Sequence, residues 1–431
     1  MEQLIKISEK DIIENWKLTA SVLLVSLMVI VRDIGLFNTP TSTFVLAFLI
    51  ACIVMPYKSL VSFFFFTIPF QAAIHGITVD ILLIAILLKT KRINSLQVVF
   101  SVIIILMEFI HLLGYSFTVD FIKFVIYAPN ILLFFFILFD DSLDNKDVYN
   151  GIKYYAIGVA VISLAIIFHA VQEYGTAGLF LGSIRIGGDA EFETSAENQF
   201  TVMNPNSLAY FSITAISLLL FIKESINNRT LKLVLLFILF LTGVLSTSRS
   251  WLLLSAIVCF TYFLTTKLKG RVGFIIMFLA FFMVAESYTD YAENLMGRFE
   301  DRFQAEDMLS VGGRESVFED YNSFLINNPE HFVFGTGVIY YKQVAKITSS
   351  IHSGFQQLYV CYGIVGVILY LTSFVLFFKR YRKGMRFQLA CFMPFFTCFV
   401  FDQTIQFLMP HFLMLPFVAT MLPLRLKKER L

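Results

Sequence analysis

Long apolar segments, separated by short polar ones, run through almost the whole chain. A helix needs about 20 mostly apolar residues to cross the hydrocarbon core of a bilayer. The apolar segments predict spans at 18–36, 41–57, 59–73, 76–89, 96–115, 119–139, 150–171, 199–222, 230–247, 249–267, 272–290, 353–378, 387–404 and 407–424. The pattern thus predicts an all-α polytopic membrane protein, a single integral membrane domain over 1–431 with about 14 transmembrane helices (12–14). The short runs at 59–73 and 76–89 predict a hairpin or a re-entrant pair.

The composition agrees with this pattern. Hydrophobic residues make up 58% of the chain and charged residues 15%, whereas a soluble domain averages about 45–50% apolar and 25% charged residues. An ordinary water-soluble enzyme is therefore excluded. The net charge of only +2 argues against a nucleic-acid partner. The five cysteines lie in apolar stretches without metal-ligand spacing, and no nucleotide or metal motif is present, so we expect no metal and no cofactor.

The positions of the basic residues predict the orientation. With both termini in the cytoplasm, 24 of the 33 lysines and arginines face the cytoplasm and 9 face outward, as the positive-inside rule requires. The polar first seventeen residues and the following apolar run predict a permanent anchor rather than a cleaved signal peptide. The nine outward cations are Arg32, Lys123, Arg185, Arg249, Arg298, Arg302, Arg314, Lys342 and Lys346. Six of them are arginine, whose planar guanidinium binds phosphate oxygens in a bidentate way, so an anionic ligand is expected on the outer side.

Two outward segments are long. Residues 173–198 form a second outer loop, and residues 291–352 form the main extracytoplasmic loop. Loops of this length are usually functional or disordered. The apolar spacing of Val317, Tyr321, Phe324 and Leu325 predicts a helix that lies on or near the membrane surface.

Two arginines in these outer regions are candidates for anion binding. Arg249 stands among small hydroxyl residues where a span begins, and a cation beside helix N-terminal amides forms an anion site. The alternative is an interfacial arginine that extends to lipid headgroups. Arg314 lies in the main loop, as do Arg298 and Arg302, and for all three the alternative is a salt bridge within the loop.

Polar residues at span ends are further candidates. His352, where the main loop re-enters the membrane, can take a proton from a sugar hydroxyl, or it caps the helix. Asn204 and Asn206 in an Asn-Pro-Asn motif either bind sugar hydroxyls or start a helix. Ionisable residues within spans default to functional hypotheses, and Glu108 and Asp402 are of this kind, although Glu108 could pair with His111 at i+3.

The order of these motifs resembles the bacterial O-antigen ligase and Wzy-type polysaccharide polymerase superfamily. The matching stretches are Ser248-Arg249-Ser250, Gly313-Arg314, Asn328-Pro329 with Gly335 and Gly337, then His352, Leu358, Gly363 and Gly366. The resemblance covers roughly residues 199–378. The chain departs from it at Ser353, where asparagine is commoner, and at Phe318, where tryptophan is usual.

This resemblance implies a membrane glycosyltransferase of the C-type (GT-C-like) class that uses neither nucleotide sugar nor metal. The donor is a glycan on undecaprenyl pyrophosphate at the outer face of the bacterial inner membrane. Arg249 and Arg314 are expected to hold the pyrophosphate and His352 to act as base. Weaker candidates for binding the phosphates are Arg185, Arg298 and Arg302. Candidates for binding the sugar are Asn204, Asn206, Gln356 and Asp402.

Within the family, a polymerase of lipid-linked repeat units is favoured because about fourteen spans exceed the twelve usual for a ligase, which transfers the glycan to lipid A core or another acceptor. A chain-length regulator is a possible protein partner, and membrane lipid surrounds the chain. From other classes, a lipid-linked oligosaccharide flippase should show duplicated halves and short loops, which are not seen. A non-catalytic scaffold would not explain the outward arginines.

Overall fold

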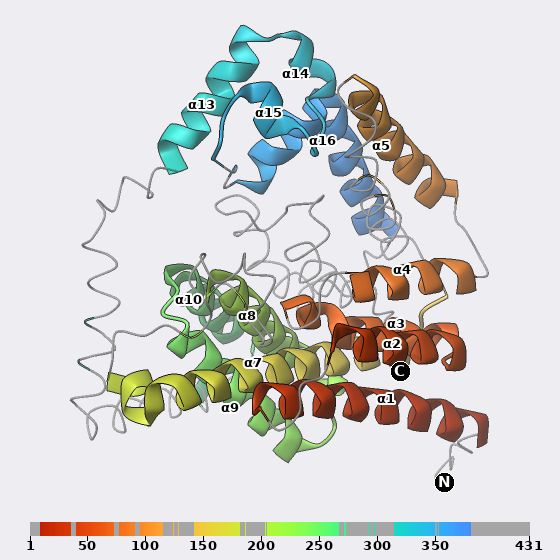
Figure 1. Ribbon diagram of the computed structural model, residues 1–431, viewed down its shortest axis with the longest axis vertical. Coiled ribbons are helices and arrows are strands. Elements are labelled where there is room, and N and C mark those ends of the chain that lie inside the picture. Colours follow the sequence, from red (N-terminus) through yellow and green to blue (C-terminus); the bar gives the residue numbers. More distant parts are fainter. Residues whose placement is uncertain are drawn as a thin grey trace.

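The structure is a computed structural model that describes residues 9–35, 40–72, 77–90, 95–114, 142–181, 205–266, 314–349 and 353–380, with a few single residues between these ranges. The described residues are mostly helical and contain no β-strand (Figure 1). The prediction of an all-α fold is therefore confirmed for this part of the chain.

Ten of the predicted spans coincide with helices. They are α1 (Glu9–Asp33), α2 (Thr41–Val54), α3 (Tyr57–Thr67), α4 (Ile77–Lys89), α5 (Ser95–Leu113), α7 (Asn145–Leu181), α8 (Pro205–Phe221), α9 (Arg229–Leu245), α10 (Arg249–Thr265) and α16 (Gly354–Arg380). The predicted spans at 119–139, 272–290, 387–404 and 407–424 lie outside the described residues or touch them only at single positions. Two helical stretches, 145–176 and 354–373, are long and apolar enough to cross a bilayer, and five others are apolar but shorter. The number of spans stays a prediction.

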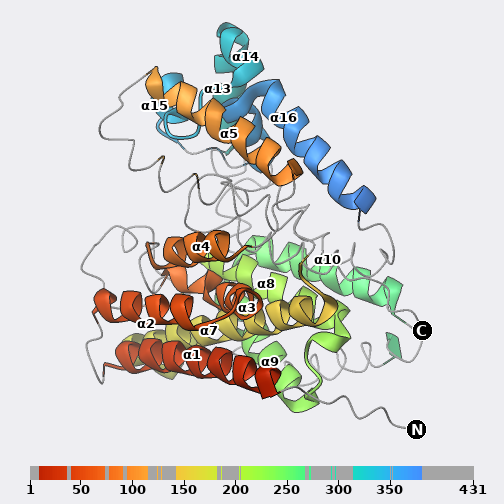
Figure 2. The same cartoon turned by 90° about the vertical axis from the view of Figure 1, so that its right-hand side faces the viewer.

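The described helices form two groups (Figures 1 and 2). The lower group contains α1 to α4 and α7 to α10, which pack on one another around α7 and α8. The upper group contains α5 and α16 together with three short helices of the main outer loop. These are α13 (Arg314–Asn327), α14 (Glu330–Phe334) and α15 (Tyr341–Ala345). The described part of the long loop thus packs on α16, mainly through α14.

The lower group is held together by the close approach of α3 and α7. Phe63 to Phe66 are fully buried in α3. A Cβ atom at Gly158 of α7 would lie 2.0 Å from the carbonyl oxygen of Phe66, so only glycine lets the two backbones come this close. After Thr67 the chain tightens into the 3₁₀ turn η1 (Ile68–Ala72), where Pro69 supplies no amide to continue an α-helix.

Residues assigned to the cytoplasmic side lie together at one end of the lower group. The Lys58 ammonium is 2.8 Å from a carboxylate oxygen of Asp144 and 2.7 Å from one of Asp147. Lys17 and Lys89 donate to main-chain carbonyls at the C-terminal end of α2. All of these residues flank spans on the side that the sequence assigns to the cytoplasm. The contacts therefore join helix ends that the sequence assigns to the same side of the membrane.

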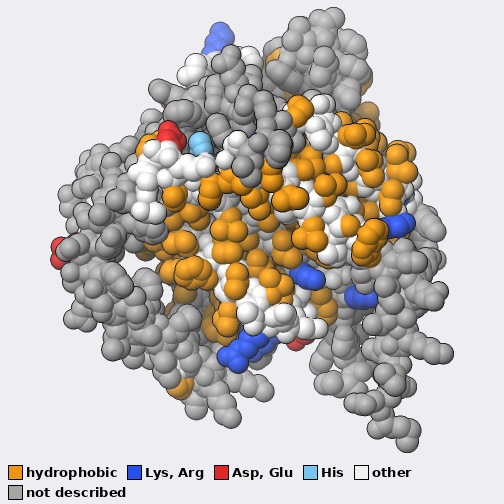
Figure 3. Space-filling model, turned by 60° about the horizontal axis from the view of Figure 1, so that its bottom comes forward, with side chains coloured by type: hydrophobic (Ala, Val, Ile, Leu, Met, Phe, Trp, Pro, Cys, Tyr) orange, Lys and Arg blue, Asp and Glu red, His pale blue; other side chains and the backbone are white. Residues whose placement is uncertain are grey.

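The lower group also presents a broad apolar surface. Figure 3 shows this surface, on which hydrophobic side chains predominate and basic side chains are few. Exposed leucines and phenylalanines on α1 and α9 are typical of it, among them Leu23, Leu27, Leu233 and Phe237. An exposed apolar area of this extent marks a membrane or protein contact. On a chain of this composition it fits lipid acyl chains.

Candidate functional site

The Asn-Pro-Asn and Ser-Arg-Ser motifs meet in the structure. The Ser248 hydroxyl donates a hydrogen bond of 2.9 Å to the side-chain oxygen of Asn206, and Ser248 is buried. Helix α8 begins at Pro205 and α10 begins at Arg249, so the bond joins two helix starts. The first amides of a helix lack partners within it and carry a partial positive charge. Two such ends beside Arg249 give this junction the character of an anion site.

The turn between α9 and α10 is tight and strained. The Ser246 hydroxyl donates to the Gly243 carbonyl at 2.7 Å, and a Cβ atom at Gly243 would lie 1.9 Å from Nε1 of Trp251. Thr247 has a φ of 45° and is buried, and its hydroxyl has no hydrogen-bond partner. A β-branched residue in this conformation is an outlier of the kind found at functional sites. No pattern in the sequence indicates it, because the strain arises from the packing of the turn.

The second outer loop reaches the same turn. The amide of Ile186 donates to the Leu245 carbonyl at 3.3 Å, and Ile186 is fully buried. Its neighbour in sequence is the candidate Arg185, which lies outside the described residues. Ile186 of this loop is therefore bonded to the end of α9, at Leu245, three residues before Ser248.

A second cluster holds α13 against the start of α16. The side-chain amide of Gln356 donates to the Phe318 carbonyl at 2.8 Å and to the Asn322 side chain at 3.3 Å. The Tyr321 hydroxyl donates to the Ser349 carbonyl at 2.9 Å, and burial raises the pKa of this hydroxyl. Arg314 is the first residue of α13. Its helix is therefore tied to residues on both sides of His352, to the main chain of Ser349 and to the side chain of Gln356.

The apolar stripe of α13 is covered largely by protein. Val317, Tyr321 and Leu325 are all buried, and the Tyr321 ring packs on Tyr341 of α15 with 5.8 Å between centroids. The helix predicted from this spacing is confirmed, and its three buried side chains are covered by protein; its place on or near the membrane surface stays a prediction. Apolar periodicity shows which face is covered and does not distinguish lipid from protein as the cover.

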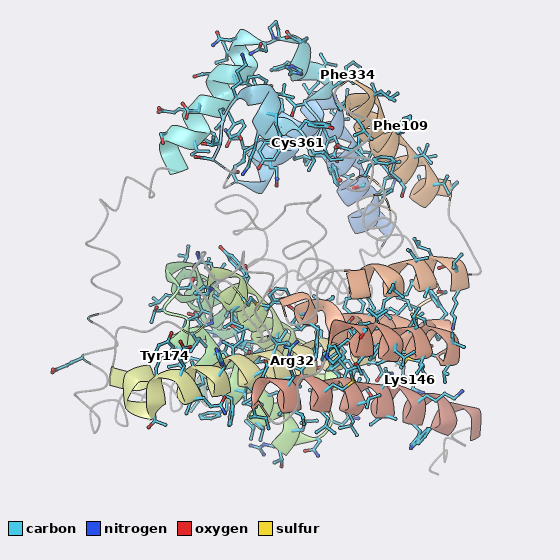
Figure 4. The ribbon with its side chains drawn as sticks, in the orientation of Figure 1. Arg32, Phe109, Lys146, Tyr174, Phe334 and Cys361 are labelled. Atoms are coloured by element: carbon cyan, nitrogen blue, oxygen red, sulfur yellow. The ribbon has the colours of Figure 1, made fainter. Side chains whose placement is uncertain are left out.

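The motif glycines explain how α14 docks on α16. Gly363 has a φ of 59° and breaks α16. The Val360 and Cys361 carbonyls just before the break accept the amides of Thr336 at 3.0 Å and Gly337 at 2.9 Å. A Cβ atom at Gly335 would lie 2.2 Å from the backbone of Cys361. Figure 4 shows Phe334 and Cys361, which flank this contact, within the upper group. The spacing of these glycines thus serves a backbone-to-backbone contact.

Comparison with known proteins identifies a family for one part of the chain. Residues 234–371 match a family model described as O-antigen ligase. The chain carries an O-antigen ligase family domain. A search of curated proteins finds no match, and neither does a search of solved structures.

The O-antigen ligase family domain begins within α9 and ends within α16. It includes the Ser-Arg-Ser turn, the main outer loop and all the motif glycines, so the resemblance seen in the sequence is confirmed. The family indicates a bacterial membrane protein of O-antigen ligase or polymerase type that acts in surface-polysaccharide synthesis. Asn206 lies outside the matched residues but is bonded to Ser248 within them.

The structure describes the predicted site residues unequally. The side chains of Asn206 and Gln356 are described, and both are hydrogen-bonded to residues of the O-antigen ligase family domain. For Arg249 and Arg314 the structure gives the helix position, the first residue of α10 and of α13. Six candidates lie outside the described residues: Arg185, Asn204, Arg298, Arg302, His352 and Asp402.

The candidate site therefore has two parts. The Arg249 part belongs to the lower group, and the part with Arg314 and the flanks of His352 belongs to the upper group. In Figure 1 the chain enters α13 at the end of that helix nearer the lower group. Within the described ranges, no three or more histidine, cysteine, aspartate or glutamate side chains are grouped to hold a metal ion.

Proposed function

We propose that the chain polymerises oligosaccharide repeat units carried on undecaprenyl pyrophosphate, as in O-antigen, capsule or exopolysaccharide synthesis. The reaction takes place at the outer face of the bacterial cytoplasmic membrane. Membership of residues 234–371 in the O-antigen ligase family supports glycosyl transfer from a lipid-linked donor. The chain crosses the membrane about fourteen times with both termini in the cytoplasm, and it needs no metal.

The observation that carries this proposal is the hydrogen bond between Ser248 and Asn206. It fixes two helix starts and the first residue of α10, Arg249, at one point. Pyrophosphate is a dianion or trianion with many acceptor oxygens. Backbone amides, helix dipoles and a guanidinium are the groups that bind such an anion without a metal.

The chemistry follows from the charge on the leaving group. An acceptor hydroxyl forms a bond to the anomeric carbon of the donor, and the bond from that carbon to the pyrophosphate oxygen breaks. Negative charge develops on this oxygen, where Arg249 and Arg314 stabilise it. The proton of the acceptor hydroxyl goes to His352, which acts as general base.

The weaker candidates have supporting roles in this proposal. Arg185, Arg298 and Arg302 add positive charge for the phosphates. Sugar hydroxyls bond to amide and carboxylate groups, for which the candidates are Asn204, Asn206, Gln356 and Asp402. A protein that regulates chain length is a further expected partner.

A ligase is the second candidate, since the matching family model carries that description. Polymerase and ligase share the donor and differ in the acceptor. The acceptor of a polymerase is a second lipid-linked repeat unit, and that of a ligase is lipid A core or another molecule. A gel of surface glycan from a deletion strain separates them. Loss of a polymerase leaves single repeat units attached to the acceptor, whereas loss of a ligase leaves long chains on the carrier lipid.

Purified protein gives the direct test. We expect it to elongate undecaprenyl-pyrophosphate-linked repeat units in detergent, with EDTA present and no nucleotide sugar added. Products would be separated by gel and released pyrophosphate lipid measured by mass spectrometry. Failure to elongate, together with transfer of the glycan to purified lipid A core, would replace the polymerase by the ligase. Absence of both reactions would overturn glycosyl transfer.

A further inference from the structure

Glu108 is a carboxylate buried in the middle of an apolar helix. It lies in α5 and is 1% exposed. Its two oxygens accept three backbone hydrogen bonds from the outer loop: the Val338 amide at 3.1 and 3.0 Å, and the Ile339 amide at 3.1 Å. A buried carboxylate is costly unless hydrogen-bond donors surround it. Its position in α5 therefore fixes the position of this loop main chain.

The same helix holds the loop at a second point. The ring Nε2 of His111, one turn after Glu108, is 3.1 Å from the Phe334 carbonyl oxygen. Gly337 packs between them, since a Cβ atom there would lie 2.8 Å from Cβ of His111. Glu108 and His111 therefore bind different parts of the loop, and the i+3 pairing open from the sequence is not what the structure shows. Figure 4 shows Phe109 of α5 near Phe334 and Cys361 in the same group.

The segment held by Glu108 lies in the chain between α13, which begins with Arg314, and the residues beside His352. It follows α14, docks on the break in α16, and leads through α15 to the main chain beside His352. The Tyr321 and Gln356 bonds then join α13 to this same region. The outer loop is thus attached to the membrane helices at Glu108 and His111 of α5 and at the Gly363 break of α16. Of these, α5 lies outside the O-antigen ligase family domain.

We propose that Glu108 is a positioning residue for glycosyl transfer: its carboxylate, by binding the Val338 and Ile339 amides, holds the loop that carries Arg314 and leads to His352 at a fixed place against α5. This inference rests on the proposed function. Glu108 touches no reacting atom in this account. It acts through the loop, because a displacement of about 1 Å in a catalytic group is enough to lower a rate about 100-fold.

Cys361 provides a readout of loop position that does not depend on activity. Its thiol is fully buried, and its carbonyl accepts the Gly337 amide next to the segment that Glu108 holds. A background with Cys52, Cys259, Cys391 and Cys398 replaced by alanine leaves Cys361 as the one thiol. Its rate of maleimide labelling in detergent would be measured in this background beside kcat and KM for the lipid-linked donor.

Three variants are compared in this background. E108A removes the three backbone contacts and the side-chain hydrogen bond with Tyr362. E108Q also removes the charge, which acts on the Cys361 thiol, but keeps the oxygen that accepts from both amides. It is therefore the conservative rescue and the control for the effect of charge on labelling. S101A is the matched control, because Ser101 is a fully buried polar residue of the same helix whose hydroxyl has no partner.

We expect E108A to label at Cys361 at least 10-fold faster and to lose about 10- to 100-fold in kcat, with KM changed less than about threefold. E108Q should be intermediate and S101A unchanged. The proposal is overturned if E108A keeps its activity, or if it loses activity while Cys361 stays protected, since that result would assign Glu108 a direct role. If E108A does not accumulate, E108Q and H111A give the same comparison. A different result would refute the proposed function alone. In that case E108A labels faster at Cys361, but the alanine variants of Arg249, Arg314 and His352 keep full activity.

Discussion

Ser248 and Asn206, 42 residues apart in sequence, are joined by a hydrogen bond of 2.9 Å that ties the start of α10 to the start of α8. Ser248 directly precedes Arg249, so the bond sets the direction in which α10 begins. The account makes this bond part of the anion site and predicts that both partners matter together.

The first prediction is a double-mutant cycle on this pair. S248A and N206A should each lower stability in detergent, with a coupling energy of about 0.5–1.5 kcal/mol, the net value of one hydrogen bond. Both should also reduce polymer synthesis, because Arg249 loses its fixed position. S255A is the matched control, since the Ser255 hydroxyl bonds only within its own helix. Additive effects of the two substitutions would show that the bond contributes nothing.

The role of Gln356 can be separated from direct sugar binding. Q356M keeps the volume of the side chain and removes the donor to the Phe318 carbonyl. If the amide serves to hold α13, thermal stability falls by the equivalent of about 1 kcal/mol and kcat falls, with little change in acceptor KM. A rise in acceptor KM at unchanged melting temperature would instead favour a sugar contact.

The docking glycines should tolerate no side chain. G335A combines a φ of 75° with overlap against the Cys361 backbone. G175A, with a φ of 69° and nothing within 4 Å, is the matched control for conformational strain alone. The ψ angles are 167° at Gly175 and −161° at Gly335. Strain in this region costs about 1–3 kcal/mol at either position, so G335A, with its additional overlap, should be clearly the more destabilising in thermal unfolding. Equal effects would argue against the close approach of α14 and α16.

The pair formed by Lys58 and Asp144 predicts a pH dependence. Burial alone would raise the pKa of Asp144, but the hydrogen bonds from Lys58 and from Asp147, together with the positive charge of Lys58, outweigh burial and lower this pKa below its usual value. A carboxyl with a lowered pKa contributes stability above its unfolded pKa of about 3.9, and the contribution is lost as the pH falls through the lower, folded pKa.

D144N tests this directly. Asp144 also accepts the Asp147 amide at the start of α7, and asparagine caps a helix as well as aspartate, so the variant removes only the charge. The two residues are 45% and 58% exposed, which limits the loss to about 1 kcal/mol. Wild type should be more stable than D144N between pH 5 and 8 in thermal unfolding, and the difference should shrink as the pH falls below about 4 and vanish below the lowered pKa of the folded state. A difference that persists in acid would contradict the assignment.

The sequence predicted the positions of helices well and their contacts poorly. Apolar runs indicated α7 and α16 because length and hydropathy are local properties. The same runs could not show that Gly158 meets Phe66, or that the stripe of Tyr321 is covered by protein. These depend on which helices become neighbours, and periodicity carries no information about that.

For the candidate site, local motifs predicted the residue types and the structure supplied the pairing. Asn206 and Ser248 both stood out as helix-start residues, but only their hydrogen bond makes them one site. Glu108 stood out because an ionisable residue in a span is costly. Its partners could not be predicted, since they are backbone amides 230 and 231 residues later. Thr247 was missed because its strain belongs to the turn.

In the proposed reaction, the outward Arg249 and Arg314 hold a lipid pyrophosphate while a sugar is transferred with His352 as base. Its most direct test is a gel of surface glycan from a deletion strain that expresses R249A, R314A or H352A at the wild-type level, with K346A as an outward-cation control. We predict that K346A restores full-length polymer, whereas each of the other three leaves at most about 1% of it, as expected when a group that stabilises developing charge is removed. Full-length polymer from R249A, R314A and H352A alike would contradict the account.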